Sequence, residues 1–218
     1  MLDTPDYLVD DVAWVRDLLG RRPWATIVAA PGGVPTATHM PVLLEERTAD
    51  GDDLTLSTHL GIPDDATLGL VYGVEVLVIV EGASGYITPG WYAWGPAVPT
   101  WNVEVAHLTA RVEILDADAT WDVLVATVAA FEQARPVPFE LTTTGPGGTD
   151  DLAYAHRIAR GVTGVRLHVT SWHAKNKMSQ DKPAEVVARI VAGLETDGDV
   201  HADPALAVAM RAVHRDLP

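Results

Sequence analysis

His59 is the first residue whose surroundings in the sequence suggest chemistry. It lies in the stretch STHLGIPDDATLG, residues 57–69, after a predicted strand and before a predicted loop that carries two aspartates and no basic residue. A histidine at the end of a strand is either a hydrogen-bonded structural residue or a ligand to a metal. The stretch itself leaves both roles open for His59.

The absence of cysteine restricts what such a metal site can contain. Without cysteine there are no disulfides, iron–sulfur clusters, thiolate nucleophiles or thiolate-ligated haem. Any metal must therefore be held by His, Tyr, Met or a carboxylate. His39 in TATHMP is a core residue or an alternative ligand, and His107 continues the face of Val103 and Val105 and is expected to be interior or interfacial. The other histidines show no ligand spacing and are interpreted as surface or packing residues: His156, His168, His173, His201 and His214.

Two further groups of residues are candidates for binding. In an acidic chain, Lys175 and Lys177 beside Ser179 and Gln180 are a candidate site for an anion. The alternative is that both lysines are solvated surface charges. An aromatic group is interpreted either as cofactor contacts or as packing at a dimer interface, where aromatic residues concentrate. It consists of Trp91, Tyr92, Trp94 and Trp101.

Charge and hydropathy disfavour several classes of function. Fifteen Lys and Arg against thirty Asp and Glu give a net charge of -15, which repels phosphate backbones and anionic lipid surfaces. Direct DNA binding is therefore disfavoured. The stretch MLDTPDYLVDD has no features of a signal peptide, and VEVLVIVEG is too short to cross a bilayer, so we expect a cytoplasmic protein. The sequence contains no GxGxxG, P-loop, HExxH or GxSxG motif.

Periodicity places these residues in a mainly β chain. The stretch DDVAWVRDLLG predicts a helix that is capped by Asp10 or Asp11 and ends at Gly20. Short, adjacent strands favour a barrel over a parallel sheet. The predicted strands are 24–30, 34–46, 54–58, 73–82, 84–88, 101–115 and 164–175. The other predicted helices are 118–134, 149–161, 183–195 and 203–215, and residues 135–148 are a predicted loop.

Three stretches resemble the PaiB-like, FMN-binding split-barrel family. They are ATHMPV (37–42), GYITPGWYAWGPAVPTWNVEVAH (85–107) and KNKMSQDKP (175–183). The resemblance implies an α+β fold, mainly β with flanking helices, built on a split β-barrel like that of pyridoxamine-phosphate oxidases. It also implies a homodimer with cofactor sites at the subunit interface. We expect residues 1–181 to form the split-barrel domain with helical insertions, and residues 182–218 to form C-terminal helices packed on the same domain.

One departure from the family pattern concerns the cofactor. Where flavin-binding members tend to read Gly-His-x-Ala-Arg-x-Asn-Pro, this chain retains His59 but has no arginine between it and Asp64. The cation that would pair bidentately with a flavin phosphate is therefore missing, and Asp64 and Asp65 would repel the phosphate.

In this respect the chain resembles the haem-dependent piperazate synthases, relatives that carry haem b in place of FMN. The resemblance implies an enzyme that cyclises N5-hydroxy-L-ornithine to L-piperazic acid, forming an N–N bond with loss of water. His59 is then the catalytic residue and the axial ligand of the haem iron, a common role for imidazole. The alternative is an FMN-binding PaiB-like transcriptional regulator or a flavin oxidoreductase. The implied cofactor site comprises His59, Leu60, Ile62, Trp91, Tyr92, Trp101, Lys175, Lys177, Ser179 and Gln180.

Overall fold

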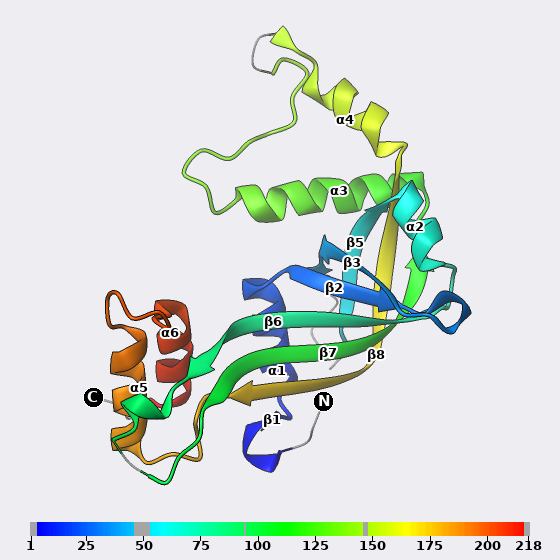
Figure 1. The fold of residues 1–218 in the computed structure, drawn as a ribbon. Helices are drawn as coiled ribbons and strands as arrows, with labels where there is room; N and C mark the ends of the chain where they lie inside the picture. Colours follow the sequence, from blue (N-terminus) through cyan, green and yellow to red (C-terminus); the bar gives the residue numbers. More distant parts are fainter. Residues whose placement is uncertain (1–3, 46–52, 94, 146–147, 216–218) are drawn as a thin grey trace. The chain divides into compact units, whose positions relative to one another are not determined.

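The computed structural model describes residues 4–45, 53–93, 95–145 and 148–215, except for the side chains of residues 63–65 (Figure 1). The predicted fold class is confirmed, because an antiparallel β-sheet with flanking helices makes up the chain. The chain divides into two compact units. Unit 1 consists of Met1–Arg22, Val80–His107 and His173–Pro218, and unit 2 of Pro23–Ile79 and Leu108–Trp172. Trp94, one of the predicted aromatic contacts, lies outside the described residues.

The sheet has the strand order β3-β2-β6-β7-β8-β5-β4, and β1 pairs with β8. The strands are β1 (Leu8–Val9), β2 (Trp24–Ala29), β3 (Thr36–Pro41), β4 (Leu43–Leu44), β5 (Thr55–Gly61), β6 (Glu75–Ile87), β7 (Thr100–Ile114) and β8 (Val162–Lys177). β6, β7 and β8 each contribute residues to both units. The β5–β8 pairing is antiparallel and matches His59 with Gly164.

The sheet of unit 2 curves back on itself. β3 and β4 stand at opposite ends of the strand order, yet only Val42 separates them in the sequence. Val42 is buried, and its N–H donates to the carbonyl of Pro23 at 2.7 Å. The Thr58 hydroxyl of β5 also donates to the carbonyl of Pro41 in β3, at 2.6 Å. Bringing the two end strands together in this way produces a split barrel, as the sequence predicts.

Aspartate caps begin four of the six α-helices in the described part of the chain. Asp11, Asp116, Asp150 and Asp203 each accept a hydrogen bond from a backbone N–H in the first turn. Such caps satisfy donors that a helix leaves free at its start. The helices are α1 (Val12–Arg21), α2 (Ile62–Leu68), α3 (Ala117–Glu132), α4 (Asp151–Ala159), α5 (Ala184–Leu194) and α6 (Pro204–Val213). No helix in the described ranges has both the length and the apolar character that a membrane crossing requires.

The core of unit 1 forms where α5 and α6 pack on β6 (Figure 1). Burial of large apolar side chains such as Ile87 and Met178 stabilises this arrangement by roughly 1.5 to 3 kcal/mol each. The buried cluster contains Ala83, Ile87, Tyr92, Met178, Val186, Val187, Ile190, Val191, Leu194, Leu206, Ala207 and Met210.

Three sequence predictions of secondary structure are wrong. The strands expected at 73–82 and 84–88 are one strand, β6, because Gly82 makes room for the side chain of Glu104 and does not form a turn. The strand expected at 34–46 is divided into β3 and β4. His59 lies inside β5, and the loop expected after it is the helix α2, whose Pro and Asp residues near its start are typical of a helix N-terminus.

Candidate functional site

His59 is a half-buried histidine in the strand β5 of unit 2. Its Nδ1 atom is buried and has no hydrogen-bond partner among the described residues. Burial lowers the pKa of His59 below its usual value of 6.5, because the charged form loses hydration. The imidazole is therefore neutral at pH 7, and the neutral form is the one that binds metals.

A cavity of about 480 Å³ opens beside His59 within unit 2. Its walls come from α3, α4 and the segment between them, and most of the side chains are apolar. Among the residues that the structure describes, Asp151 is the one carboxylate in the lining, and no lysine or arginine contributes to it. The lining residues are His59, Trp121, Leu124, Val125, Thr127, Val128, Phe139, Leu141, Asp151, Tyr154, Ala155, Ile158, Ala159 and Val162. We call this the His59 cavity; its size and apolar character are typical of small-molecule and cofactor sites.

The close packing of α3 on β8 positions the wall of this cavity. Gly164, which pairs with His59 across the strands, donates its N–H to the hydroxyl of Thr120 at 3.1 Å. A Cβ atom at position 164 would lie 2.9 Å from the Cα of Thr120. Only glycine allows the first turns of α3 to approach so closely, and the following residue, Trp121, then lies in the cavity wall.

Two neighbours of His59 that were predicted to contact the cofactor do not line the His59 cavity. Leu60 is fully buried in the core, and Ile62 is 48% exposed at the start of α2. The side chains of Asp64 and Asp65, predicted to repel a phosphate, lie outside the part of the chain that the structure describes.

Sequence reasoning missed the residues that do form the wall. The sequence feature that could have identified these residues is the excess of apolar side chains in and around α3 and α4. Val125, Phe139, Tyr154 and Ile158 are between 42% and 55% exposed although all four line the cavity. A pattern that leaves large apolar residues in water indicates a binding surface.

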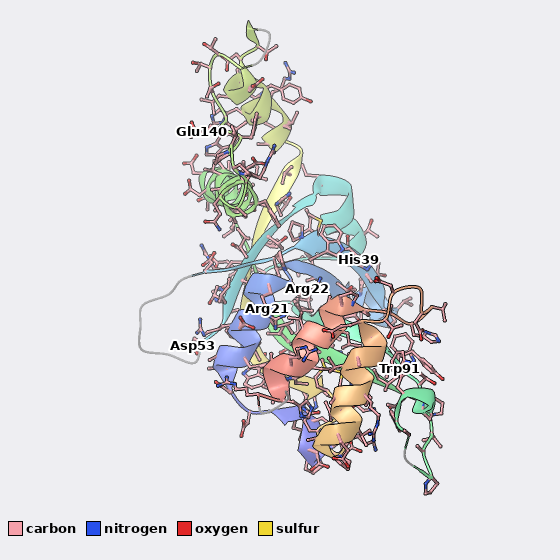
Figure 2. All side chains as sticks on the ribbon, turned by 90° about the vertical axis from the view of Figure 1, so that its left-hand side faces the viewer. Arg21, Arg22, His39, Asp53, Trp91 and Glu140 are labelled. Carbon is pink, nitrogen blue, oxygen red and sulfur yellow. The ribbon has the colours of Figure 1, made fainter. Side chains whose placement is uncertain are left out.

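The other histidines have different surroundings. His39 is exposed on β3 (Figure 2), and His107 is half-buried in β7, where burial lowers its pKa. His156 stacks on Trp121 with ring centroids 3.7 Å apart. Within the described ranges, no group of three or more His, Asp or Glu side chains could hold a metal ion. A metal bound through His59 would therefore have to bring most of its own ligands, as a haem iron does.

The predicted aromatic contacts lie in unit 1. Trp91 packs against α5 (Figure 2), with indole atoms 2.4 to 2.6 Å from where a Cβ of Gly193 would stand. Tyr92 is 1% exposed and belongs to the buried cluster of unit 1. Trp101 is 59% exposed and meets Tyr86 edge to face at 6.4 Å.

The predicted anion-binding residues also lie in unit 1, and they differ in the hydrogen bonds that their polar groups make within the protein. The hydroxyl of Ser179 and the side-chain amide of Asn102 exchange hydrogen bonds of 3.0 and 3.2 Å in the core. Gln180 accepts from the N–H of Met178 and donates to the carbonyl of Asn176. Lys177 donates to the hydroxyl of Thr100. Lys175 lies on β8 opposite Leu8 of β1.

A second cavity, of about 490 Å³, brings three of these predicted residues together. Tyr92, Lys177 and Ser179 contribute to its lining, whereas Trp91 and Trp101 do not. Lys175 and Gln180 are also absent from it. The lining residues are Tyr7, Tyr92, Pro96, Ala97, Val98, Thr100, Lys177, Ser179, Asp181 and Lys182. We call this the Lys177 cavity.

Comparison with known proteins gives related sequences and structures. Residues 1–171 match the protein family described as "Putative FMN-binding domain". The chain is 22% identical over 199 residues to the "Protease synthase and sporulation protein PAI 2" of Bacillus subtilis, which covers 91% of both chains. The FAD and heme binding protein from Mycobacterium smegmatis has a similar fold, with a TM-score of 0.56, 18% identity and coverage of 83% of this chain and 78% of that one. The flavocytochrome Anf3 from Azotobacter vinelandii has a TM-score of 0.52, with 15% identity and coverage of 78% and 69%.

Proposed function

We propose, since this chain belongs to the family of PaiB-like, FMN-binding split-barrel proteins, that it is a haem enzyme of the piperazate-synthase type. The substrate would be N5-hydroxy-L-ornithine and the product L-piperazic acid. In this reaction the bond between the α-nitrogen and N5 forms, the N5–O bond breaks, and one water leaves. The reaction is redox-neutral, so it requires no external reductant.

The observation that carries this proposal is the imidazole of His59 in the wall of an apolar cavity, with an Nδ1 atom that is buried and has no hydrogen-bond partner among the described residues. Apolar walls suit the faces of a porphyrin, and a neutral imidazole suits ferrous or ferric iron. We assign Nε2 as the ligating atom, because Nδ1 is enclosed by the protein. When bound, the haem iron would supply a Lewis acid that polarises the N–O group of the substrate.

The lining of the His59 cavity suits the apolar faces of either cofactor and provides no cation for a flavin phosphate in the described residues. The phosphate of FMN is a dianion and is normally held by charge-assisted hydrogen bonds from Arg or Lys. Among the described residues the lining contains neither residue type, so the propionates of haem would lack a cation there as well. Two proteins of similar fold, the FAD and heme binding protein of Mycobacterium smegmatis and the flavocytochrome Anf3, support the idea that this fold accommodates haem as well as flavin.

The chain's own residues would then bind the substrate and exclude water. Asp151 offers the cavity its carboxylate, which suits the α-ammonium of the substrate and can accept its proton. Tyr154 offers a hydroxyl that can protonate the leaving oxygen. The apolar side chains of α3 and α4 lower the local dielectric and strengthen these interactions.

We also expect a homodimer, as in the family that the chain resembles. Trp101 is the predicted interface residue that remains exposed and therefore accessible to a partner. Sedimentation of the purified protein at micromolar concentration tests this expectation, and a stable monomer that retains its cofactor would contradict it.

The second candidate function is a flavin-binding regulator or oxidoreductase. The family match and the Bacillus subtilis relative favour it. The visible absorption spectrum of the purified protein separates the two candidates. A Soret band that shifts on reduction supports haem, whereas the paired bands of a flavin without a Soret band would contradict it.

Turnover tests the reaction itself. The haem-loaded protein should convert N5-hydroxy-L-ornithine into a product lighter by one water, detected by mass spectrometry. L-Ornithine, which lacks the N–O bond, is the control and should remain unchanged. Haem-loaded protein that leaves the hydroxylated substrate intact would contradict the proposed activity while leaving haem binding in place.

A further inference from the structure

The lysines of this chain are concentrated in one short segment. All three, Lys175, Lys177 and Lys182, lie between residues 175 and 182, in a protein whose net charge is -15. Lys177 and Lys182 line the Lys177 cavity in unit 1. Two of the three lysines of this chain therefore line one cavity.

Lys177 is a half-buried cation whose hydrogen-bond partner is a neutral group. Its ammonium donates to the hydroxyl of Thr100 and lies 5.8 Å from the centre of the Tyr7 ring. None of the ion pairs in the described residues includes Lys177. Burial lowers the pKa of Lys177, which means that the site does not fully replace the hydration of its charge.

The carboxylate in the cavity is engaged by other residues. Asp181 accepts from the ammonium of Lys182 at 2.7 Å and also holds a hydrogen bond with Tyr7. These interactions lower the pKa of Asp181 against the effect of burial, so its charge is stabilised by Lys182 and Tyr7. The two lysines outnumber the aspartate, which leaves the cavity with a local excess of positive charge.

Tyr92 is a second residue of the cavity that could bind an anion. It contributes to the wall, and its hydroxyl is buried without a hydrogen-bond partner in the described residues. A buried hydroxyl without a partner is costly, and a ligand that accepts its hydrogen removes that cost. Pro96, Ala97 and Val98 form the apolar part of the lining.

We infer that the Lys177 cavity binds a small organic ligand through an anionic group, a carboxylate or a phosphate, which pairs with Lys177 and accepts a hydrogen bond from Tyr92. Ser179 and Gln180 are not direct ligands in this site, because their side chains already make hydrogen bonds to other residues of the chain. The inference goes beyond the proposed haem function, since none of these residues lines the His59 cavity and no haem is needed for the anion to bind.

The test is an NMR titration of the haem-free protein, first with inorganic phosphate and separately with propionate. Ions of so few atoms can bind with dissociation constants on the order of millimolar. We expect saturable shifts in the amide signals of Thr100 and Ser179 with at least one of the two ions. Saturation by phosphate alone assigns a phosphate ester, and saturation by propionate alone assigns a carboxylate. Saturation by neither ion overturns the inference.

Two substitutions that change the charge of the Lys177 cavity in opposite directions make the test specific. Lys177→Gln should weaken binding at least tenfold, whereas Asp181→Asn should tighten it, because it removes the cavity's negative charge. Arg211→Gln is the matched control: it also removes one positive charge, but from an exposed ion pair with Glu195 in the same unit. The affinity of Arg211→Gln for phosphate or propionate should stay within twofold of that of the unaltered protein. Equal affinities of Lys177→Gln and Arg211→Gln would overturn the inference.

A second measurement remains decisive if Lys177→Gln fails to fold. An anion beside Lys177 stabilises its ammonium and reduces the fraction of reactive amine. Saturating phosphate or propionate should therefore slow acylation of Lys177 in the unaltered protein severalfold, while Lys175 reacts at its original rate. Peptide mass spectrometry after a short exposure to an acylating reagent measures both sites. An unchanged rate at Lys177 would overturn the inference.

Discussion

His59 of β5 lies directly opposite Gly164 of β8 in the antiparallel pairing. Gly164 also supports the first turns of α3, through its hydrogen bond to Thr120 and its lack of a Cβ atom. One pair of residues thus connects the imidazole with the helix that walls its cavity. The placement of α3 over His59 depends on the absence of a side chain at position 164.

Gly164→Ala should therefore disturb both stability and the His59 cavity. The new methyl group would meet the backbone of Thr120 at 2.9 Å, so α3 must move. We expect the free energy of unfolding to fall by about 1 to 3 kcal/mol, as is usual for overpacking, and haem affinity to fall with it. Denaturant unfolding and a haem titration measure the two effects.

Gly161→Ala is the control for this substitution. Its added methyl group would stand 3.5 Å from the nearest atom, the carbonyl oxygen of Ile158, which is an ordinary contact. Its effect on stability should stay within about 0.5 kcal/mol. Equal effects of the two substitutions would contradict the role assigned to Gly164.

Tyr92→Phe should leave the ligand-free protein as stable as before or stabilise it by up to about 1 kcal/mol. The substitution removes a buried hydroxyl that has no hydrogen-bond partner in the described residues, and it keeps the ring in the core. Tyr7→Phe is the matched comparison, since the Tyr7 hydroxyl is bonded to Asp181 and its loss should cost about 1 kcal/mol. Thermal unfolding of both variants measures the contrast, and a larger loss for Tyr92→Phe would show that its hydroxyl is satisfied.

The ion-pair cluster around Glu113 should make stability depend on pH. His168 lies 2.6 Å from one oxygen of Glu113 and Arg166 donates to the other at 3.0 Å. The hydrogen bond from His168, then that from Arg166, lowers the pKa of Glu113 below its usual 4.5. Because the folded-state pKa lies below the unfolded-state pKa, the stabilisation is complete above about pH 4.5 and is lost as the pH falls through the lower folded-state value.

Glu113→Gln therefore should lower the melting temperature at pH 7, and its difference from the unaltered protein should shrink as the pH falls below about 4.5. Glu195→Gln, in the exposed pair with Arg211, controls for the loss of one negative charge. Melting curves between pH 3 and pH 7 provide the measurement, with these limits chosen to span roughly the usual carboxyl range. A difference that grows toward acid pH contradicts the assignment.

Helices and strands that depend on residues close together in the sequence were predicted correctly. The cap at Asp11 and the long apolar alternation of β7 are visible in the sequence, and both elements formed close to the expected bounds. Gly82 was misread as a break, since the reason for its small size is the side chain of Glu104, which lies 22 residues later. The start of α2 was overlooked because the segment was interpreted as a loop.

The candidate site was harder to predict because its residues are distant in the sequence. His59 was identified from its own position, but Trp121 and Tyr154 of the cavity wall follow it by more than sixty residues. The Lys-x-Ser-Gln pattern likewise gave no sign that Ser179 would bond to Asn102 in the core. Periodicity identifies faces of helices and strands, whereas a cavity depends on which faces meet.

The direct measurement of the central claim is the haem content of His59→Ala compared with His39→Ala. Both variants remove one imidazole from unit 2, but His39 is exposed on β3 and does not line the His59 cavity. After reconstitution with haem, the account predicts that His59→Ala loses most of its Soret absorbance and regains part of it with free imidazole, while His39→Ala keeps the original spectrum. A His59→Ala protein with full haem occupancy and an unchanged Soret band would contradict the account.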